Sequence, residues 1–193
     1  MRVFLAGASG VIGQRLIPLL VAGGHTVCGM TRSPAKAPLL RDLGAEPLVC
    51  DVYELGDLLR SVQSFQPDVI VHQLTDLPDD AAKLRETALG NARIRTEGTR
   101  NLLAAATQAR VQRFLAQSIA WQLPAGPAAD AVAELEASVL AVDGVVLRYG
   151  QFYGPGTYYE QEPPTGLRIH IDAAARRTVE ALNDATGVVT IVE

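Results

Sequence analysis

Short apolar runs alternate along the chain with longer stretches in which apolar and polar positions follow a helical period. Residues 69–74 are almost continuously apolar, as in a strand that is covered on both faces. Residues 55–65 show the contrasting pattern, in which apolar side chains recur every three or four positions. The whole pattern predicts strands at 3–6, 26–30, 46–49, 69–74, 114–117, 145–148 and 188–192, and helices at 11–21, 35–43, 55–65, 81–109, 130–142 and 172–182.

This alternation of strands and helices predicts the fold class. A chain of this kind forms an α/β fold, a doubly wound parallel sheet with helices on both faces. The length of 193 residues is enough for one such domain with a sizeable core, and we expect a single domain over residues 1–193. Ligands bind such sheets at the carboxyl ends of the strands, so the candidate functional residues are those that follow strands.

Three glycines at three-residue spacing, Gly7, Gly10 and Gly13, join the first predicted strand to the first predicted helix. A helix N-terminus offers unpaired N–H groups and a partial positive charge, and glycine lets a diphosphate approach them because it has no Cβ. An ordinary strand-to-helix turn that uses glycine is the alternative. The context favours a dinucleotide site of the Rossmann-like, NAD(P)-binding type, formed by Gly7, Ser9, Gly10, Val11, Ile12 and Gly13.

The end of the second predicted strand carries no acidic residue. An NAD(H) site usually places Asp or Glu there, where the carboxylate binds the ribose 2′-hydroxyl. Here the residues are Thr31, Arg32 and Ser33. The guanidinium of Arg32 matches a 2′-phosphate, and the two hydroxyls add donors. We therefore predict that NADP(H) is preferred and that NAD(H) is the second choice; a solvated surface arginine is the alternative.

Asp51 and Val52 follow the third predicted strand and lie at the same edge of the sheet. We expect them to contact the adenine, with Asp51 accepting a hydrogen bond from its exocyclic amine. Asp51 is equally suited to cap the helix that begins near residue 55.

The composition narrows the function classes. Hydrophobic residues make up 48% of the chain and charged residues 20%, which suits a folded domain. The net charge is −4 without a run of Lys and Arg, so we expect no nucleic-acid partner. No apolar stretch reaches the ~18 residues of a membrane helix, and we expect a cytoplasmic protein without membrane contact. Cys28 and Cys50 are expected to be buried reduced thiols, and we expect no metal site.

These motifs together resemble the short-chain dehydrogenase/reductase superfamily, in its extended and atypical branch of NAD-dependent epimerases and dehydratases. The resemblance spans nearly the whole chain, and the order of the motifs is more specific than any single one. The matching stretches are residues 7–13, 24–27, 31–33, 51–52, 96–102 with Asn91, 114–118, 147–156 and 169–174. The resemblance implies that Gln73, Leu74 and Asn91 also face the cofactor, and that residues 150–193 contain a reduced substrate lobe.

The resemblance also implies hydride transfer between a nicotinamide and a carbonyl or sugar carbon. A serine orients the substrate oxygen, and a tyrosine, activated by a lysine four residues later, acts as general acid or base. Ser118 matches the serine. Aligning Glu136 with the family's glutamate puts Ala128 and Val132 at the tyrosine and lysine positions, and neither moves a proton. A strand-end hydroxyl bonded to the backbone is the alternative for Ser118.

A substitute acid is expected in the loop that follows the strand at 145–148. Tyr149 and Tyr153 are the candidates for a catalytic role, and Arg148 is suited to lower a phenol pKa or to hold an acidic substrate. Aromatic packing of this loop against the sheet is the alternative.

Residues 119–130 and 160–168 are short segments compared with the family. Together with the missing tyrosine and lysine, they leave two functions open. One is an NADP(H)-binding oxidoreductase, or epimerase/dehydratase-like protein, of atypical mechanism that acts on a carbonyl or sugar-type small molecule. The other is a non-catalytic NADP(H)-binding redox sensor or interaction module. The helices at 81–109 and 130–142 carry small residues that allow close packing, so a homodimer is also expected.

Overall fold

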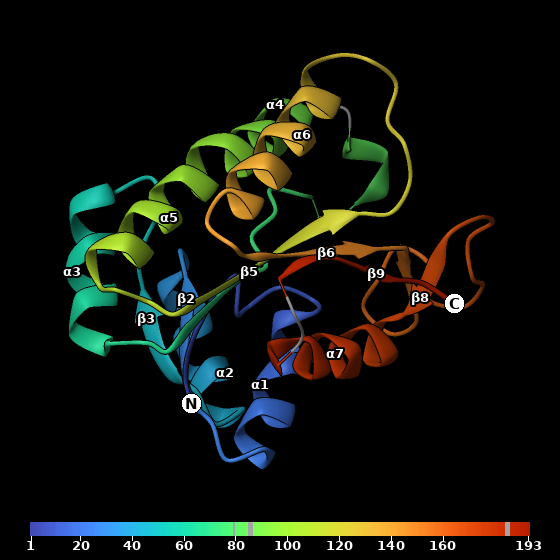
Figure 1. Ribbon diagram of the computed structural model, residues 1–193. Coiled ribbons are helices and arrows are strands. Elements are labelled where there is room, and N and C mark those ends of the chain that lie inside the picture. Colours follow the sequence, from blue (N-terminus) through green and yellow to red (C-terminus); the bar gives the residue numbers. More distant parts are fainter. Residues whose placement is uncertain (79, 85–86, 184–185) are drawn as a thin grey trace.

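Seven parallel strands form one sheet in the computed structural model, which describes residues 1–78, 80–84, 87–183 and 186–193 (Figure 1). The strands lie in the order β3-β2-β1-β4-β5-β6-β9, so the chain order reverses between β1 and β4. Their bounds are β1 Arg2–Ala6, β2 Thr26–Thr31, β3 Glu46–Val49, β4 Val69–His72, β5 Arg113–Ile119, β6 Val145–Tyr149 and β9 Gly187–Ile191. The predicted doubly wound sheet is confirmed, and its reversal is the place where such sheets bind ligands.

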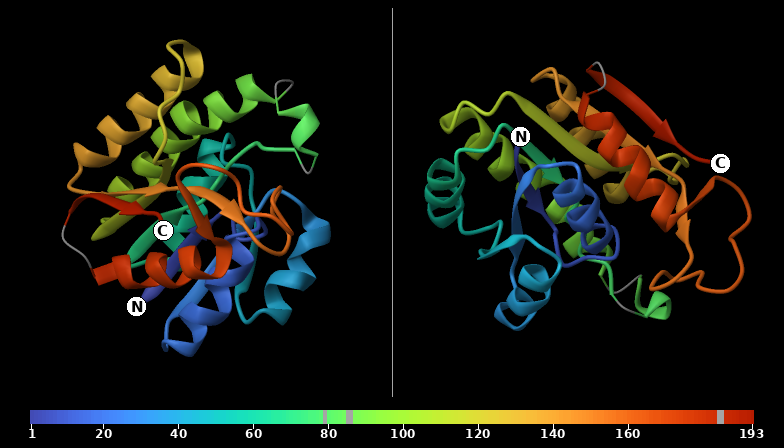
Figure 2. Two further views of the ribbon diagram at one scale, coloured as in Figure 1. Left: turned by 90° about the vertical axis from the view of Figure 1, so that its right-hand side faces the viewer. Right: turned by 90° about the horizontal axis from the view of Figure 1, so that it is seen from below.

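Helices cover both faces of this sheet (Figure 2). One face packs against α1, α2 and α7, and the other packs against α3, α5 and α6, while α4 packs against α6. The helices are α1 Gly13–Ala22, α2 Ala37–Asp42, α3 Leu55–Phe65, α4 Ala88–Arg93, α5 Thr99–Gln108, α6 Pro127–Leu140 and α7 Ile171–Glu180. Short 3-10 turns lie at Pro34–Lys36, Ala81–Lys83 and Ala181–Asn183, and a π-helical turn lies at Ile94–Gly98. No helix of the described ranges is long and apolar enough to cross a membrane.

Strand β1 shows why the central strands are apolar at every position. Val3 and Leu5 pack on the side of α1 and α7, whereas Phe4 and Ala6 pack on the side of α3 and α5. All four side chains are fully buried. Because successive residues of a strand point to opposite faces, a strand covered on both faces has no position left for a polar side chain. The loops after β1 and β4 therefore start from a rigid centre.

The predicted helix at 81–109 is wrong as one continuous helix. In the described part of this range, a 3-10 turn at Ala81–Lys83 is separate from α4, and the π-helical turn joins α4 to α5; residues 85–86 lie outside the described residues. Leu84 and Leu89 are exposed, Leu89 by 79%. A helix in this stretch would have no apolar face buried on the sheet, and such burial supplies most of a helix's stability in a protein.

A second, two-stranded sheet was not expected from the sequence. Strand β7 (Gln151–Tyr153) pairs in parallel with β8 (Arg168–His170). Strands of three residues are too short for the alternating pattern on which the prediction depends, and the glycines and prolines between them indicate a loop. Gly150 has a packing role here, since a Cβ at this position would lie 2.6 Å from the backbone nitrogen of Arg168.

His72, the last residue of β4, makes the stability of the fold depend on pH. Its ring is buried; Nδ1 accepts a hydrogen bond from the Leu74 amide, and Nε2 lies 3.1 Å from the Thr99 hydroxyl. Burial, and secondarily the charge of Arg95, lowers the pKa of His72 to about 4 from the usual 6.5. As the pH falls below 6.5, His72 becomes protonated in the unfolded chain but stays neutral in the folded chain. The free energy of unfolding therefore decreases until about pH 4, where the folded chain also binds the proton.

We expect this histidine to contribute up to about 3 kcal/mol to the loss of unfolding free energy between pH 7 and pH 4. Urea unfolding at several pH values should give a flatter profile for His72→Asn than for the parent chain. His25→Asn is the control, because His25 is partly exposed at the amino edge of the sheet and its pKa is lowered with only modest burial. Parallel profiles for the parent chain and His72→Asn would contradict the assignment.

Candidate active site

The turn after β1 presents backbone amides at the reversal of the sheet. Gly7 has a φ of 89°, and a Cβ there would lie 2.6 Å from the carbonyl oxygen of Gln73. Helix α1 follows Ile12, which caps it without a side-chain hydrogen bond, and its first turn holds no acidic residue. The amides of Val11 and Ile12 donate no hydrogen bond to the described part of the chain. Free amides at a helix N-terminus fit the predicted diphosphate site.

Gly10 and Gly13 have different roles in this turn. Gly10 is exposed, and a Cβ there would come no closer than 3.3 Å to the Gly7 carbonyl oxygen. A Cβ on Gly13 would lie 2.4 Å from that oxygen and 2.7 Å from the carbonyl oxygen of Ala8. Gly13 therefore allows the start of α1 to pack against the carbonyl groups of the turn, whereas Gly10 leaves open the face on which a ligand approaches.

The end of β2 brings together the polar residues predicted for the adenosine side. The buried Thr31 hydroxyl lies 3.0 Å from the Ser9 hydroxyl and accepts a hydrogen bond from the Ser33 amide. These bonds hold the Gly7–Gly13 turn against β2. The Arg32 side chain is 67% exposed, and its Nη2 donates to Asp76 Oδ1 at 2.9 Å. A guanidinium thus stands at the strand end, as predicted, although it is paired.

Asp76, which the sequence analysis did not single out, is held in place by its surroundings. Its amide donates to the Asn91 side-chain oxygen at 3.2 Å, and a Cβ on Gly90 would lie 2.1 Å from Asp76 Oδ2. Asn91, which was predicted to bind the cofactor, is nine-tenths buried. Through its bond to the Asp76 amide it positions the loop after β4. A carboxylate fixed opposite Arg32 competes with any anion that Arg32 binds.

The consecutive residues Asp51 and Val52 differ in exposure, since Asp51 is exposed and Val52 is buried. Asp51 is exposed and accepts a hydrogen bond from the Tyr53 amide at 3.0 Å, whereas Glu54 is the residue that precedes α3. Asp51 therefore caps a turn before the helix and not the helix itself. Val52 is buried, and its carbonyl oxygen accepts from Asn101. Their contact with adenine remains a prediction.

Gln73 and Leu74 extend β4 beneath the glycine turn. The Gln73 side-chain nitrogen donates to the Tyr149 hydroxyl at 3.1 Å, while its buried Oε1 has no partner in the described part of the chain. The Leu74 amide donates a hydrogen bond to Nδ1 of His72. Gln73 thus touches the turn through its backbone and leaves one buried acceptor unused, which is unusual in a packed core.

Ser118, Glu136 and Arg148 form one hydrogen-bonded cluster at the carboxyl end of β5 and β6. Ser118 and Arg148 are opposite each other in the register of the two strands, and Glu136 reaches them from α6. The Ser118 hydroxyl donates to Glu136 Oε1 at 2.6 Å; Arg148 Nε donates to Oε1 at 2.9 Å and Nη2 to Oε2 at 2.5 Å. Ser118 therefore bonds a carboxylate, not the backbone.

The charges of this cluster stabilise each other. Burial alone would raise the pKa of Glu136, but the hydrogen bonds from Arg148 and Ser118 and the positive charge of Arg148 hold it below its usual value. The bond to Glu136 raises the pKa of Arg148. Because the Ser118 proton points to a carboxylate that stays ionised, only the lone pairs of the Ser118 oxygen remain for a further hydrogen bond, and the residue is 5% exposed.

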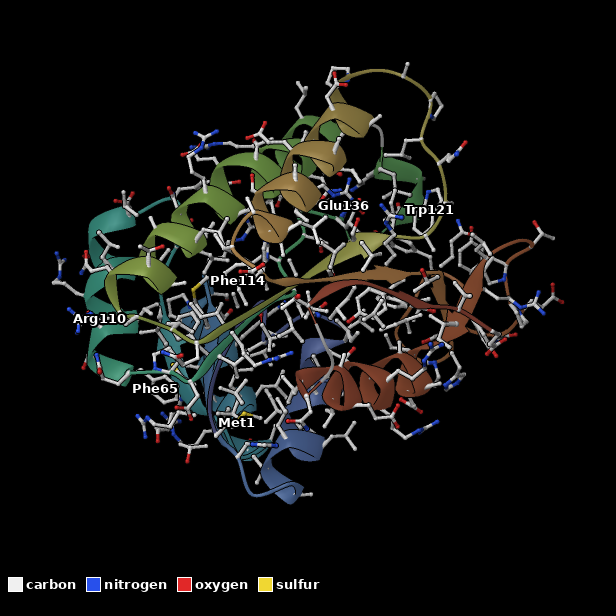
Figure 3. All side chains as sticks on the ribbon, in the orientation of Figure 1. Met1, Phe65, Arg110, Phe114, Trp121 and Glu136 are labelled. Atoms are coloured by element: carbon white, nitrogen blue, oxygen red, sulfur yellow. The ribbon has the colours of Figure 1, made fainter. Side chains whose placement is uncertain are left out.

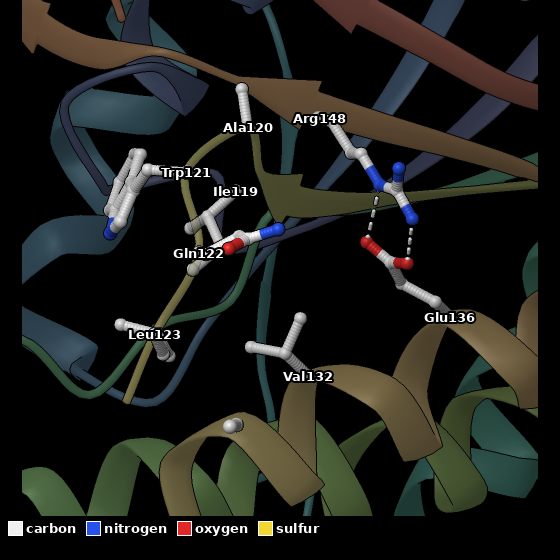
Figure 4. A pocket seen from close by; sticks show the side chains of 9 residues that line it. Ile119, Ala120, Trp121, Gln122, Leu123, Val132, Glu136 and Arg148 are labelled. Atoms are coloured by element: carbon white, nitrogen blue, oxygen red, sulfur yellow. Dashed lines mark hydrogen bonds and ion pairs between the residues drawn. The ribbon is translucent and has the colours of Figure 1, made fainter. Parts of the chain in front are cut away.

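A cavity of about 390 Å³ lies beside this cluster (Figure 4). Its wall is formed by the loop after β5 and by the facing side of α6. Helix α6 starts with Pro127 after Gly126, a position suited to proline because the first helical amide needs no partner. Ala129 and Val132 line the cavity from α6, and Trp121 and Leu123 line it from the loop. The side chains of Ala129 and Val132 are small, which leaves this space open.

The two predicted substitute acids lie elsewhere. The Tyr149 hydroxyl is buried between Thr178, at 2.6 Å, and Gln73, and burial raises its pKa. Its side chain packs on the α7 side of the sheet, opposite to Ser118. This placement argues against a catalytic role for Tyr149, because a phenol that is enclosed and harder to ionise does not reach a substrate.

Tyr153 lies on β7, and its hydroxyl donates to the Glu193 carboxylate at 2.6 Å. That bond is the main cause of its raised pKa. Tyr153 does not line the cavity beside Ser118. The Tyr153 hydroxyl is therefore engaged by Glu193, and its predicted catalytic role receives no support from the geometry.

Two parts of the site were missed in the sequence. Trp121, the single tryptophan of the chain, lies just beyond Ala120 in the loop after β5, and this position after a strand was the available signal. Glu136 served only to align the helix, whereas it connects Ser118 with Arg148. Figure 3 shows Trp121 and Glu136 at one end of the molecule and Met1, Phe65 and Arg110 at the other. No group of three or more potential metal ligands occurs in the described residues.

The fold and the glycine turn together define a nucleotide-binding domain of the Rossmann-like type. The model of the NAD dependent epimerase/dehydratase family matches residues 3–130. The chain belongs to this family, and its sheet is a Rossmann-like NAD-binding epimerase fold. The predicted resemblance to this family is confirmed.

Relatives of similar sequence include oxidoreductases. A 3-diazoavenalumate denitrifying reductase from Streptomyces sp is 36% identical over 235 residues, which cover 100% of this chain and 76% of that protein. A 3-beta-hydroxysteroid dehydrogenase from Mycolicibacterium neoaurum is 33% identical over 116 residues, 59% of this chain and 31% of that protein. The first alignment is longer than the chain, so the reductase contains segments that this chain lacks. The family and these relatives together support an NAD(P)-binding oxidoreductase or epimerase-like function.

Solved structures of similar fold include two sugar-nucleotide epimerases. UDP-glucose 4-epimerase from Thermus thermophilus, in complex with NAD, has a TM-score of 0.80 at 20% identity, covering 100% of this chain and 78% of that one. The enzyme of the same name from Thermotoga maritima, with UDP-glucose, has a TM-score of 0.81 at 18% identity, covering 100% and 77%. At these identities the likeness shows the fold alone.

Proposed function

We propose that the protein is an NADP(H)-dependent reductase whose hydride acceptor needs no proton from the enzyme. The observation that carries the proposal is that the glycine turn and the Ser118 cluster both lie at the carboxyl edge of the sheet, while α6 lacks the family's acid. The glycine turn and its free amides are intact, and Ser118 is present, yet α6 offers neither a tyrosine nor a lysine. Lysine is absent from the whole chain after Lys83. An intact nucleotide site without the family's acid favours reactions that do not require one.

Residues of the turn and of β2 would hold the cofactor. The Val11 and Ile12 amides suit the diphosphate, and Arg32 suits a 2′-phosphate after it exchanges its bond to Asp76. NADPH supplies a hydride when it is bound. Ser118 orients the acceptor through its oxygen lone pairs, since Glu136 takes its proton. The cavity beside α6 holds the body of the acceptor.

The Streptomyces relative suggests one class of acceptor. Its name describes a reductase that removes nitrogen from a diazo compound. When a hydride adds to the ring carbon of an aryl diazonium, the C–N bond breaks and dinitrogen leaves with the bonding electrons. Such a step balances without a proton, which matches an α6 that has no acid. Diazo arenes are therefore our first candidates for the substrate.

A non-catalytic function as an NADP(H)-binding redox sensor is the second candidate. The missing tyrosine and lysine favour it, as does the Arg32–Asp76 pair, which an incoming phosphate would have to open. A Photosystem II assembly factor Ycf39 from Synechocystis is 27% identical over 62% of this chain, so assembly factors also occur among its relatives. A cytoplasmic location and a homodimer remain predictions for either function.

Oxidation of NADPH in the presence of an ortho-diazophenol, a quinone and benzaldehyde distinguishes these functions. We expect turnover with the diazophenol, release of dinitrogen, and transfer of deuterium from [4-²H]NADPH to the ring. Benzaldehyde should react at least about a hundredfold more slowly, because its alkoxide product needs an acid and general acids contribute ~10²–10⁴ in rate. Faster reduction of benzaldehyde would contradict the proposal, and binding without any turnover would favour the sensor.

A further inference from the structure

The cavity beside Ser118 has an apolar body and one charged corner. Trp121, Leu123 and Val132 supply apolar walls, while Gln122, Glu136 and Arg148 are its polar lining. Its volume of about 390 Å³ is at the low end of the range for small-molecule sites. A nucleotide sugar would also need many more polar partners than these. The lining therefore suits a small ligand with a flat apolar part.

The charged corner favours an anion although it contains both signs. Both oxygens of Glu136 are used by Ser118 and Arg148, and its side chain is only 12% exposed. The Arg148 side chain is 42% exposed, and its Nη1 makes no hydrogen bond to the described part of the chain. Figure 4 shows Nη1 turned away from Glu136 and the Gln122 amide directed toward this corner. The donors that remain available there suit a carboxylate.

We propose that this cavity binds an aromatic carboxylate, with the ring between Trp121 and Val132 and the carboxylate at Arg148 Nη1. The inference rests on the proposed function in one respect only: it names the class of acceptor that the reductase would take. The acid group gives the ligand one orientation.

Trp121 makes the binding directly measurable. As the single tryptophan of the chain it reports on this cavity alone. The probes are 3-phenylpropionate, its amide 3-phenylpropionamide, and propionate, titrated into the full chain without nucleotide; calorimetry gives the same constants independently of fluorescence. We expect 3-phenylpropionate to bind at least about tenfold more tightly than either of the other two probes. Equal affinity of the acid and the amide would overturn the proposal.

Two variants test the two halves of the cavity. Val132→Phe fills the apolar part and should weaken 3-phenylpropionate binding at least about tenfold, whereas Ala133→Phe, one position along on the exposed face of α6, should leave it unchanged. The double variant Glu136→Gln, Arg148→Gln avoids an unpaired buried charge and should make acid and amide bind alike. Unchanged binding in Val132→Phe, or a retained preference for the acid in the double variant, would overturn the proposal.

These experiments can contradict the cavity assignment without contradicting the proposed reductase function, and the reverse also holds. Carboxylate binding is measured without nucleotide, so it stands or falls on the cavity alone. NADPH oxidation without binding of the aromatic acid would leave the reductase and overturn the acceptor class. Binding of the acid without any NADPH oxidation would leave the cavity assignment and overturn the reductase.

Discussion

Gly10→Val is expected to weaken NADPH binding by roughly a hundredfold while the free energy of unfolding stays nearly unchanged. Gly10 is exposed, and the nearest atom to an added Cβ is the Gly7 carbonyl oxygen at 3.3 Å, so the folded chain needs only a small adjustment. The valine side chain would stand on the face from which a diphosphate reaches the Val11 and Ile12 amides. Titration of NADPH fluorescence, together with thermal unfolding, measures both quantities.

Gly13→Ala is the matched control, because it changes the same turn but is expected to reduce stability, which Gly10→Val leaves nearly unchanged. Its Cβ would lie 2.4 Å and 2.7 Å from two backbone oxygens, so the variant should lose about 3 kcal/mol of stability. If Gly10→Val bound NADPH as tightly as the parent chain, the turn would not be the nucleotide site. If it lost as much stability as Gly13→Ala, its effect on binding would be indirect.

Arg32→Gln is expected to weaken NADPH binding by about 10- to 100-fold and to leave NADH binding unchanged. A hydrogen bond to a charged group contributes ~1.5–3 kcal/mol, and only the phosphorylated nucleotide offers that group. Paired equilibrium titrations with NADPH and NADH measure the selectivity. Equal affinities of the parent chain for the two nucleotides would contradict the predicted preference for NADP(H).

Two further variants separate the phosphate contact from the ion pair. Asp76→Asn removes the carboxylate that competes for Arg32 and should strengthen NADPH binding severalfold. Arg60→Gln is the control, since Arg60 is 75% exposed and pairs with Asp57 in a similar surface ion pair. A weaker affinity in Asp76→Asn would mean that Asp76 orients Arg32 for the phosphate.

The elements that alternate most regularly were the easiest to predict. The bounds of β3 and α3 agree with the sequence pattern residue for residue, and the alternation predicted the doubly wound parallel sheet. The helix predicted at 81–109 was wrong only in its first part, where Leu84 is exposed, whereas α4, the π-helical turn and α5 follow one another from Ala88 to Gln108. The β7–β8 pair was not predicted, because each strand is too short to show a period and the two strands are distant in sequence.

The candidate site was predictable where one segment makes it. The glycine turn and the strand-end residues Thr31 to Ser33 are local motifs, and the structure brings them together as expected. The contacts of Asp76 with Arg32 and of Glu136 with Ser118 join elements that are distant in sequence, so the local pattern did not predict these contacts. Tyr149 lies on the face of the sheet opposite to Arg148, because one position along β6 changes the face on which a side chain lies.

The order of the site residues along the chain has a practical consequence. The residues proposed for the nucleotide all lie between Gly7 and Asn91, whereas Ser118, Glu136 and Arg148 follow later, after α5. The two groups meet through the β4–β5 pairing. A crossover placed between α5 and β5 would therefore exchange the acceptor half for that of another family member and keep the cofactor half, which makes this junction the natural place to build chimeric enzymes.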